Sequence, residues 1–200
     1  MFVAVEGSLA AGKTVLLSYL AQAFAVPVYK EPVDSWAPLL QRFYDGEEGA
    51  FGVQTKIMAD VTVGQGGAQG DGVYERCAWT QPWTFIRVMF EDGLLSVEQR
   101  DLLIAANRIL ARQPDVIIYL RCDPKVAMQR LIRRGRACEA NVSLDYMEHM
   151  HTAYETMARE VRGRGDVALH TVDVSCMDIG EVKSTIGFYL SNVVGLPLAK

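Results

Sequence analysis

Residues 7–14 carry the clearest chemical pattern in this sequence. They read Gly-Ser-Leu-Ala-Ala-Gly-Lys-Thr, a full match to G-x-x-x-x-G-K-[ST], here called the P-loop. Glycines in such a loop let backbone N–H groups turn towards phosphate oxygens. The Lys13 ammonium adds a full positive charge, and the Thr14 hydroxyl can bind Mg²⁺. The pattern predicts a site for the phosphates of ATP or GTP, formed by Gly7, Ser8, Leu9, Ala10, Ala11, Gly12, Lys13 and Thr14.

Charged side chains follow two further apolar segments that are predicted to be strands. Glu31 comes just after residues 26–29, and Glu75 and Arg76 come directly after residues 73–74. Because the carboxyl ends of strands line the ligand crevice of an open α/β sheet, we expect these side chains beside the phosphate site. A carboxylate there can take a proton from an attacking hydroxyl, and an arginine can stabilise a transferred phosphate. Either acid alone would be interpreted as a solvated strand end, but their shared placement predicts phosphoryl transfer.

A basic segment at residues 130–136 contains four arginines in seven residues and is followed by Glu139. One interpretation is a solvated helix end, where arginine interacts favourably with the last carbonyl groups. The alternative is a mobile lid that brings guanidinium groups onto a transferred phosphate and excludes water. Gly135 and Ala137 interrupt the helical pattern, so we expect a lid at about residues 133–142 in which Arg134 and Arg136 contact ATP.

Short apolar runs alternate with helical patterns, which predicts an α/β fold with a largely parallel sheet. The expected strands are 2–5, 26–29, 73–74, 116–120 and 167–172. The expected helices are 13–24, 36–44, 51–61, 78–91, 96–112, 124–134, 144–162 and 178–192. Residues 64–72 contain five glycines and predict a flexible loop. That segment lacks a full G-x-G-x-x-G and precedes its strand, so a dinucleotide-binding fingerprint is rejected.

Composition narrows the class of protein further. The length of 200 residues predicts one domain, residues 1–200. A net charge of −4 argues against a nucleic-acid polymer as partner. The four cysteines form no C-x-x-C motif, which favours reduced thiols. The sequence shows no secretory signal and no apolar run near the length of about 20 residues that a membrane span needs. We therefore expect no membrane partner and a cytoplasmic location.

Four segments together resemble the deoxynucleoside kinase family, which includes thymidine, deoxycytidine and deoxyguanosine kinases. They are residues 7–14, 31–36 (Glu-Pro-Val-Asp-Ser-Trp), 75–77 (Glu-Arg-Cys) and 134–139 (Arg-Gly-Arg-Ala-Cys-Glu), and the resemblance covers about residues 2–190. It implies a P-loop kinase fold, with a five-stranded, mostly parallel sheet flanked by helices and an arginine-rich lid. It also implies ATP and Mg²⁺ as cofactors, a small nucleoside as substrate, and a homodimer for which residues 78–91 and 144–162 are candidate interface helices.

The same resemblance implies roles for individual residues around the reacting phosphate. Glu31 corresponds to the base that takes the proton from the nucleoside 5′-hydroxyl. Arg76 corresponds to the arginine that holds this base and the phosphate, and Glu75 to the acid that supports Mg²⁺. Lys13, Arg134 and Arg136 correspond to the cations that contact ATP.

On the nucleoside side, Tyr44 and Glu139 correspond to the pair that binds the sugar 3′-hydroxyl. Gln54 corresponds to the glutamine that reads the base edge, and Trp36 and Phe85 to the side chains that enclose the base. The resemblance also implies that Ile57, Val61 and Gln81 line the base pocket, and these residues provide no charged pair. An uncharged pocket favours pyrimidine deoxynucleosides over purines, with thymidine first. Cys77 replaces the usual serine, Val53 replaces the usual phenylalanine, and the P-loop interior differs, so the substrate range stays open.

Two other functions remain open at this stage. A nucleoside monophosphate kinase such as thymidylate kinase shares the fold, P-loop and lid, but it should carry an additional arginine near its acceptor. The segment 31–36 and Glu139 favour a nucleoside with a free 5′-hydroxyl instead. A non-catalytic nucleotide-binding switch is the second alternative. A guanine-binding Asn-Lys-x-Asp motif is absent from the sequence, and a switch would give the lid arginines no purpose.

Overall fold

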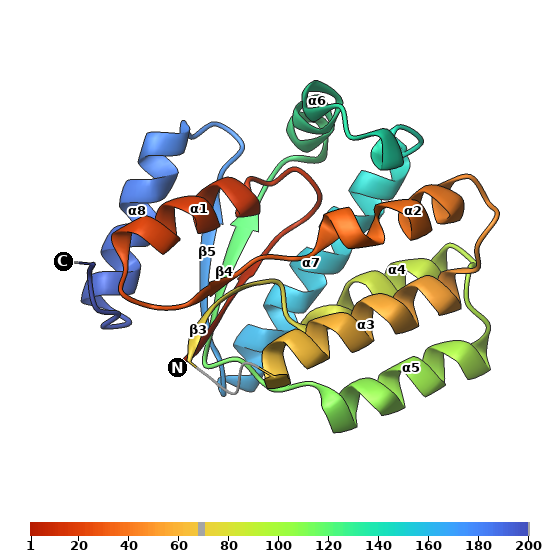
Figure 1. Ribbon diagram of the computed structural model, residues 1–200, viewed down its shortest axis with the longest axis horizontal. Helices are drawn as coiled ribbons and strands as arrows, with labels where there is room; N and C mark the ends of the chain where they lie inside the picture. The colour runs from red at the N-terminus through yellow and green to blue at the C-terminus, as the bar shows by residue number, and fades with distance from the viewer. Residues whose placement is uncertain (68–70, 200) are drawn as a thin grey trace.

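A parallel five-stranded sheet forms the centre of the computed structural model, which describes residues 1–67 and 71–199 (Figure 1). The strand order is β2-β3-β1-β4-β5. The strands are β1 (Phe2–Glu6), β2 (Val28–Tyr29), β3 (Gly72–Glu75), β4 (Val116–Arg121) and β5 (Ala168–Asp173). All strand pairs are parallel, which confirms the predicted sheet. Within the described part of the chain, no helix has the length and hydropathy that crossing a membrane requires.

The strands alternate their side chains between two separate cores. Val3 and Val5 of β1 pack with α1 (Lys13–Ala23) and α8 (Ile179–Asn192), whereas Phe2 and Ala4 pack with α7 (Leu144–Arg164). Alternation with a period of two is inherent in a strand, and a sheet covered on both faces needs apolar residues throughout. Figure 1 accordingly shows α1 and α8 on one side of the sheet and α7 on the other.

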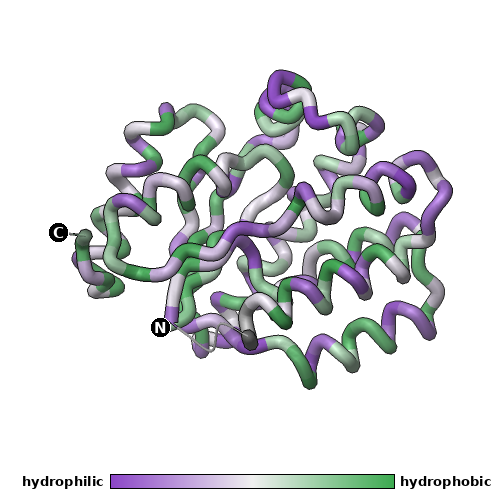
Figure 2. Tube along the Cα trace, in the orientation of Figure 1, coloured by the Kyte–Doolittle hydropathy of each residue, from purple (hydrophilic) through white to green (hydrophobic). Residues whose placement is uncertain are grey.

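The remaining helices form a side bundle and the edge of the site. They are α2 (Val33–Tyr44), α3 (Ala50–Gly67), the 3₁₀ helix η1 (Ala78–Trp83), α4 (Phe85–Glu91), α5 (Val97–Leu110), α6 (Pro124–Arg134) and the 3₁₀ helix η2 (Ala137–Glu139). Figure 1 shows α2, α3, α4 and α5 beside one another, and Figure 2 shows hydrophilic and hydrophobic residues alternating along α3 and α5. This alternation is expected of helices with one face on a core and one in solvent.

The predicted loop at residues 64–72 is wrong at both of its ends, and its centre, residues 68–70, lies outside the described residues. Helix α3 continues to Gly67, and β3 already begins at Gly72. The exposed Gly64 weakens a helix by only about 1 kcal/mol, which an established helix can absorb. At Gly72, a Cβ atom would lie 2.8 Å from the carbonyl oxygen of Pro27, so glycine permits the close approach of β2 and β3.

The single helix predicted at residues 78–91 is also wrong, because the chain forms η1 and then α4. Pro82 has no N–H to donate, so it cannot continue a helical hydrogen-bond ladder. Thr84 breaks the helical conformation with φ −114° and ψ −101°, and its hydroxyl donates to the Thr80 carbonyl over 3.1 Å. The break turns Phe85 and α4 towards the cavity described below.

Candidate active site

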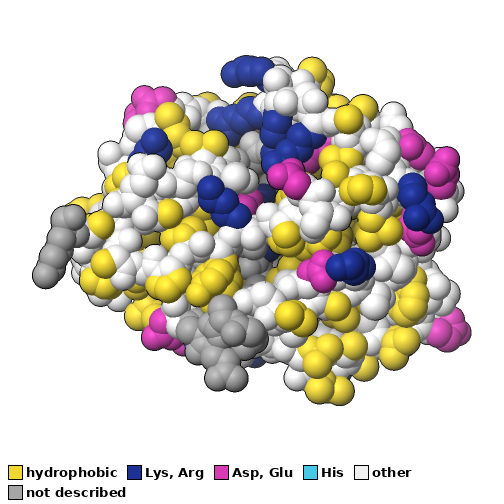
Figure 3. Space-filling view, in the orientation of Figure 1, with side chains coloured by type: hydrophobic (Ala, Val, Ile, Leu, Met, Phe, Trp, Pro, Cys, Tyr) yellow, Lys and Arg dark blue, Asp and Glu magenta, His cyan; other side chains and the backbone are white. Residues whose placement is uncertain are grey.

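A cavity of about 620 Å³ opens at the carboxyl ends of the strands, between the P-loop, α2, α3 and the segment after α6. Figure 3 shows this hollow below a group of Lys and Arg side chains around α6. The sequence-predicted residues that line it are Leu9, Ala10, Ala11, Gly12, Lys13, Thr14, Glu31, Trp36, Tyr44, Gln54, Ile57, Glu75, Arg76, Gln81, Phe85, Arg134, Arg136 and Glu139. Its volume falls in the range expected for small-molecule sites.

The P-loop follows β1 and ends at the first turn of α1, as the sequence predicts. Gly12 has φ +103°, a conformation that side-chain-bearing residues rarely adopt. A Cβ at Gly7 would lie 2.7 Å from the Leu120 carbonyl oxygen, so β4 also requires glycine there. Lys13 Nζ donates to the carbonyl oxygens of Gly7 and Ser8 over 3.0 and 2.8 Å, which holds the ammonium inside the loop. The loop therefore has the shape of a phosphate cradle with its cation in place.

The Lys13 ammonium is nearly inaccessible to solvent, with 5% of the residue exposed. The pKa of Lys13 is lowered to about 7, mainly by burial and in the same direction by the positive charge of Arg76. Glu75 and Glu31 act in the opposite direction. The negative charge of bound phosphates would also favour the protonated form.

Thr14 and Glu75 meet at the mouth of the P-loop, where the Thr14 hydroxyl donates to Glu75 Oε1 over 2.8 Å. A hydroxyl and one carboxylate beside a phosphate cradle fit Mg²⁺, which usually binds one or two carboxylates together with substrate phosphates. The described residues contain no group of three or more acidic, histidine or cysteine ligands. The donor set thus suits a cation that arrives with the nucleotide.

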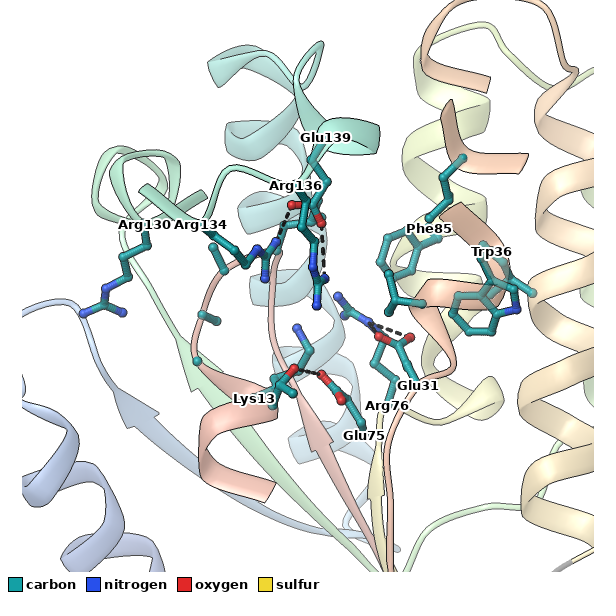
Figure 4. A pocket seen from close by; sticks show the side chains of 18 of the residues that line it. Lys13, Glu31, Trp36, Glu75, Arg76, Phe85, Arg130, Arg134, Arg136 and Glu139 are labelled. Atoms are coloured by element: carbon teal, nitrogen blue, oxygen red, sulfur yellow. Dashed lines mark hydrogen bonds and ion pairs between the residues drawn. The ribbon is translucent and has the colours of Figure 1, made fainter. Parts of the chain in front are cut away.

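Glu31 and Arg76 form a buried ion pair facing Lys13 (Figure 4). Arg76 Nε lies 3.0 Å from Glu31 Oε1, and the two side chains are 9% and 10% exposed. Burial raises the pKa of Glu31, whereas Arg76 and Lys13 lower it. A buried carboxylate whose basicity is increased in this way is suited to accept a proton from a hydroxyl.

Two residues that the sequence analysis did not identify support Arg76 from below. Arg76 Nη1 donates to the Gly7 carbonyl oxygen over 2.7 Å and to the Tyr154 hydroxyl. That hydroxyl donates to Glu6 Oε2 over 3.2 Å. Tyr154 and Tyr146 lie eight residues apart on the buried face of α7. This spacing of two aromatic residues with hydroxyl groups is the sequence signal that could have identified Tyr154 as a residue near the site.

The opposite end of the cavity is largely apolar and contains two amide side chains. Gln54 Nε2 donates to Gln81 Oε1 over 3.0 Å, and both residues are buried. The Trp36 indole N–H donates to Asp60 Oδ2 over 2.7 Å, which fixes the ring at the cavity wall. The guanidinium carbon of Arg76 lies 4.8 Å from the centre of the Phe85 ring, so Phe85 stands between the charged cluster and this end.

Ile57 lines this end of the cavity, but Val61 does not. Val61 packs behind the cavity wall against Trp36 and Ala78. The sequence analysis missed several apolar lining residues, namely Val33, Leu40, Phe43, Val53 and Met89. Val33, Leu40 and Phe43 form a row with Trp36, at successive spacings of three, four and three residues. The helical periodicity of α2 could therefore have identified them.

Tyr44 and Glu139 face the cavity from α2 and η2, and Tyr146 faces it from α7. Burial raises the pKa of Tyr44 well above its usual value, with Tyr146 and Glu139 acting in the same direction. The Tyr44 hydroxyl therefore keeps its proton and can donate to a ligand. A hydroxyl donor beside a carboxylate acceptor is a suitable pair for one sugar hydroxyl.

Arg134 and Arg136 project over the cavity from the end of α6, where Gly135 ends the helix in the left-handed conformation. Both arginines contact Glu139: Arg134 Nη2 lies 2.5 Å from Oε2, and Arg136 Nη1 lies 3.6 Å from Oε1. Their side chains are about one-third exposed, at 31% and 32%. Arg130 also lines the cavity, to one side of Arg134 in Figure 4. The predicted closure of this segment remains a prediction.

Comparison of this sequence with known proteins places the chain in the deoxynucleoside kinase family. The deoxynucleoside kinase family profile matches residues 3–188. A deoxyadenosine kinase of Dictyostelium discoideum is 28% identical over 172 residues, which cover 80% of this chain and 67% of that protein. The mitochondrial thymidine kinase 2 of Homo sapiens is 27% identical over 167 residues, covering 76% and 62%. These two relatives are named for different bases.

The structure of a deoxyadenosine kinase from M. mycoides with the products dCMP and dCDP bound has the same fold. It superimposes with a TM-score of 0.85 at 22% identity and covers 96% of this chain and 100% of that one. The P-loop kinase fold expected from the sequence is thereby confirmed.

Proposed function

We propose that this chain, which belongs to the deoxynucleoside kinase family, transfers the γ-phosphoryl group of ATP to the 5′-hydroxyl of a deoxynucleoside. The observation that carries this proposal is the buried pair of Glu31 and Arg76, which faces Lys13 across the cavity. A carboxylate there can deprotonate a hydroxyl that lies between it and the phosphate cradle. A hydrogen-bonded arginine and a lysine then stabilise the charge that develops on the transferred group.

In the proposed reaction, Glu31 takes the proton of the 5′-hydroxyl as the O5′–P bond forms and the bond from the γ-phosphorus to the bridging oxygen breaks. Arg76 fixes the carboxylate through Nε and offers further N–H groups to the phosphate. Lys13 and the P-loop N–H groups hold the leaving diphosphate. Bound Mg²⁺ would neutralise part of the phosphate charge, and Thr14 and Glu75 are the residues that would hold it.

For the nucleoside, the apolar end of the cavity supports a base-binding site. The Gln54 amide keeps one N–H and its carbonyl oxygen beyond the bond to Gln81, which suits the adjacent carbonyl and N–H groups of thymine. Trp36 and Phe85 would enclose the ring, and Tyr44 and Glu139 would bind the 3′-hydroxyl. We therefore expect pyrimidine deoxynucleosides to be preferred to purines, with thymidine first.

A monophosphate kinase is less well supported as the reaction of this cavity. A substrate that already carries a 5′-phosphate would place a dianion beside the Glu31 carboxylate, and the two would repel each other. Phosphorylation of a free hydroxyl uses that carboxylate directly.

One assay tests the proposed function and its alternatives together. ATP consumption with Mg²⁺ is measured with the four deoxynucleosides, with their 5′-monophosphates, and with neither, and the products are separated. We expect turnover with deoxynucleosides and the highest kcat/KM for thymidine. Turnover with monophosphates alone, or with none of these compounds, would contradict the proposed reaction. A purine at the top of the ranking would contradict only the base preference.

Assembly and location are separate proposals. We expect one cytoplasmic kinase domain that pairs into a homodimer, with η1 and α4 or α7 in the interface. Light scattering on the purified protein distinguishes a dimer of about twice the chain mass from a monomer. A charged substitution such as Thr152→Arg on the exposed face of α7 should weaken a dimer that uses this helix.

A further inference from the structure

Tyr154 lies beneath the cavity, where its hydroxyl joins two charged side chains, Glu6 at the end of β1 and Arg76 directly after β3. The residue is fully buried on α7. Its hydroxyl accepts a hydrogen bond from Arg76 Nη1 and donates one to Glu6 Oε2 over 3.2 Å. Burial raises the pKa of Tyr154 well above its usual value, so the hydroxyl stays protonated and keeps its donor role. A three-membered chain therefore runs from Arg76 through Tyr154 to Glu6.

Glu6 is a fixed end for this chain. It is fully buried at the end of β1 and does not line the cavity. Its other oxygen, Oε1, accepts from the Cys77 backbone N–H over 2.9 Å and from the Thr80 hydroxyl over 2.6 Å. The carboxylate is thus held by the turn between β3 and η1, and it cannot move towards a substrate.

The Tyr154 hydroxyl bridges Arg76 and Glu6, which lie too far apart for a direct hydrogen bond. Arg76 Nη1 lies 3.9 Å from Glu6 Oε2, which is too long for a hydrogen bond. The hydroxyl between them accepts from the guanidinium and donates to the carboxylate. An interior hydrogen bond with an ionised partner is stronger than one between neutral groups, so the link is a firm one.

Arg76 needs such support because its backbone conformation is unfavourable. Its φ is +63°, a conformation that costs about 1–2 kcal/mol for a residue with a side chain. The guanidinium is held at Nε by Glu31 and at Nη1 by Tyr154 and the Gly7 carbonyl oxygen. Fixing Nη1 therefore also fixes the direction in which Nε meets Glu31.

We infer that Tyr154 is a positioning residue, which orients Arg76 towards Glu31 by linking its guanidinium to the buried Glu6 carboxylate. Its effect on turnover rests on the proposed function, but its effect on Arg76 does not. Tyr154 does not line the cavity, so it acts through Arg76 and not by touching a substrate.

The chain offers a closely matched control in Tyr119 of β4. The Tyr119 and Tyr154 rings are stacked, with centroids 5.6 Å apart and planes 14° apart, and both side chains are buried. The Tyr119 hydroxyl instead donates to Glu155 Oε1 over 2.9 Å. Tyr154→Phe and Tyr119→Phe thus remove the same atom from two neighbouring rings, and only the first variant changes a contact of Arg76.

The first measurement does not need turnover. In protein labelled with ¹⁵N-arginine, the Arg76 Nε–H signal is assigned by its loss in Arg76→Lys, and its hydrogen exchange is measured. We expect exchange to become about tenfold faster or more in Tyr154→Phe, and to stay unchanged in Tyr119→Phe. Thermal unfolding first verifies that both variants are folded. An unchanged exchange rate in Tyr154→Phe would overturn the inference, even if the protein phosphorylates no nucleoside.

The second measurement compares the kinetics of the same variants. We expect kcat to fall roughly tenfold to a hundredfold in Tyr154→Phe, as for loss of a hydrogen bond to a charged group, with both KM values within about twofold. The acidic limb of the kcat profile should move to higher pH, because Glu31 loses part of the stabilisation that Arg76 gives it. The other charged groups facing Glu31, namely Lys13, Glu75 and Glu6, are unchanged in this variant. Wild-type kcat and an unmoved profile in Tyr154→Phe would overturn the inference, whereas an inactive wild-type protein would contradict the proposed function alone.

Discussion

Two regions of the cavity present arginines, and the structure holds them in different ways. Arg76, directly after β3, is 9% exposed and contacts Glu31, Tyr154 and the backbone of Gly7. The lid arginines Arg134 and Arg136 are about one-third exposed, and both pair with Glu139. The cluster around Arg76 is thus fixed by the sheet before substrates bind. The lid is held by contacts that a more highly charged ligand could replace.

This difference gives the two regions different tasks. The fixed cluster is suited to orienting a base, because a small displacement of a catalytic group costs much of its effect. The lid is suited to exchange: arginines that now contact Glu139 can move to phosphate oxygens, which accept from guanidinium groups as carboxylate oxygens do. Glu139 would then become available to the sugar hydroxyl. We therefore expect the two regions to respond differently to substitution, pH and ligands.

Among the substitutions and titrations that compare the two regions, the largest effect is expected for Lys13→Ala in the fixed region. Loss of a buried cation beside the transferred phosphate should lower kcat about 10²–10³-fold while the fold is retained. Steady-state kinetics together with circular dichroism measure both properties. Near-normal turnover in a folded Lys13→Ala protein would show that the P-loop lysine does not serve the reaction.

A smaller effect is expected for the lid. Arg136→Ala should lower kcat roughly tenfold to a hundredfold, because it removes one charged contact to the phosphate. Arg133→Ala is the matched control, since Arg133 is exposed at the same helix end and does not line the cavity. Limited proteolysis near residues 133–140 should also slow when a bisubstrate ATP–nucleoside analogue is bound. Unchanged cleavage at saturation would indicate a plain surface helix end.

The smallest effect concerns proton binding, because Lys13 in the fixed region titrates near neutral pH and the lid arginines do not. The pKa of Lys13 is about 7 in the folded protein, against an ordinary value of 10.5. The unfolded chain therefore binds more protons between these values, and this group makes the free energy of unfolding rise as pH increases from 7 to 10.5. Bound phosphates should raise this pKa, so ATP binding at pH 8 should take up a fraction of a proton.

Calorimetry in buffers of different ionisation enthalpy measures this uptake. Lys13→Met should abolish it, and Arg136→Ala should retain it because arginine stays protonated over this range. Equal uptake in Lys13→Met and wild type would show that the proton binds elsewhere.

The sequence predicted those parts of the molecule that depend on local spacing. The P-loop residues, Glu31 and the Glu75–Arg76 pair each lie next to a strand, and parallel strands bring their ends to one edge. The alternation of apolar segments likewise predicted the sheet. By contrast, the continuation of α3 through Gly64 depends on the rest of the helix being already established. The break at Thr84 depends on Pro82 and on local packing. A periodic pattern of apolar residues reveals neither feature.

The contacts beneath the site could not be predicted for a different reason. Tyr154 and Glu6 are separated by 148 positions in the chain, and no motif links them. Their contact exists because α7 packs on one face of the sheet, against β1. The packing of Val61 behind Trp36, away from the cavity, similarly follows from how α3 is rotated against α2 and not from the spacing of Val61 and Gln54.

The most direct test of the account is the kinetics of Glu31→Gln, which keeps the shape of the side chain and removes its basicity. Asp34→Asn is the matched control, because it neutralises an exposed acid three residues away. If Glu31 is the base, kcat should fall about 10²–10⁴-fold with the KM for the nucleoside little changed, while Asp34→Asn stays near wild type. A Glu31→Gln protein with wild-type kcat and a raised KM would contradict this, because Glu31 would then bind the substrate without taking its proton.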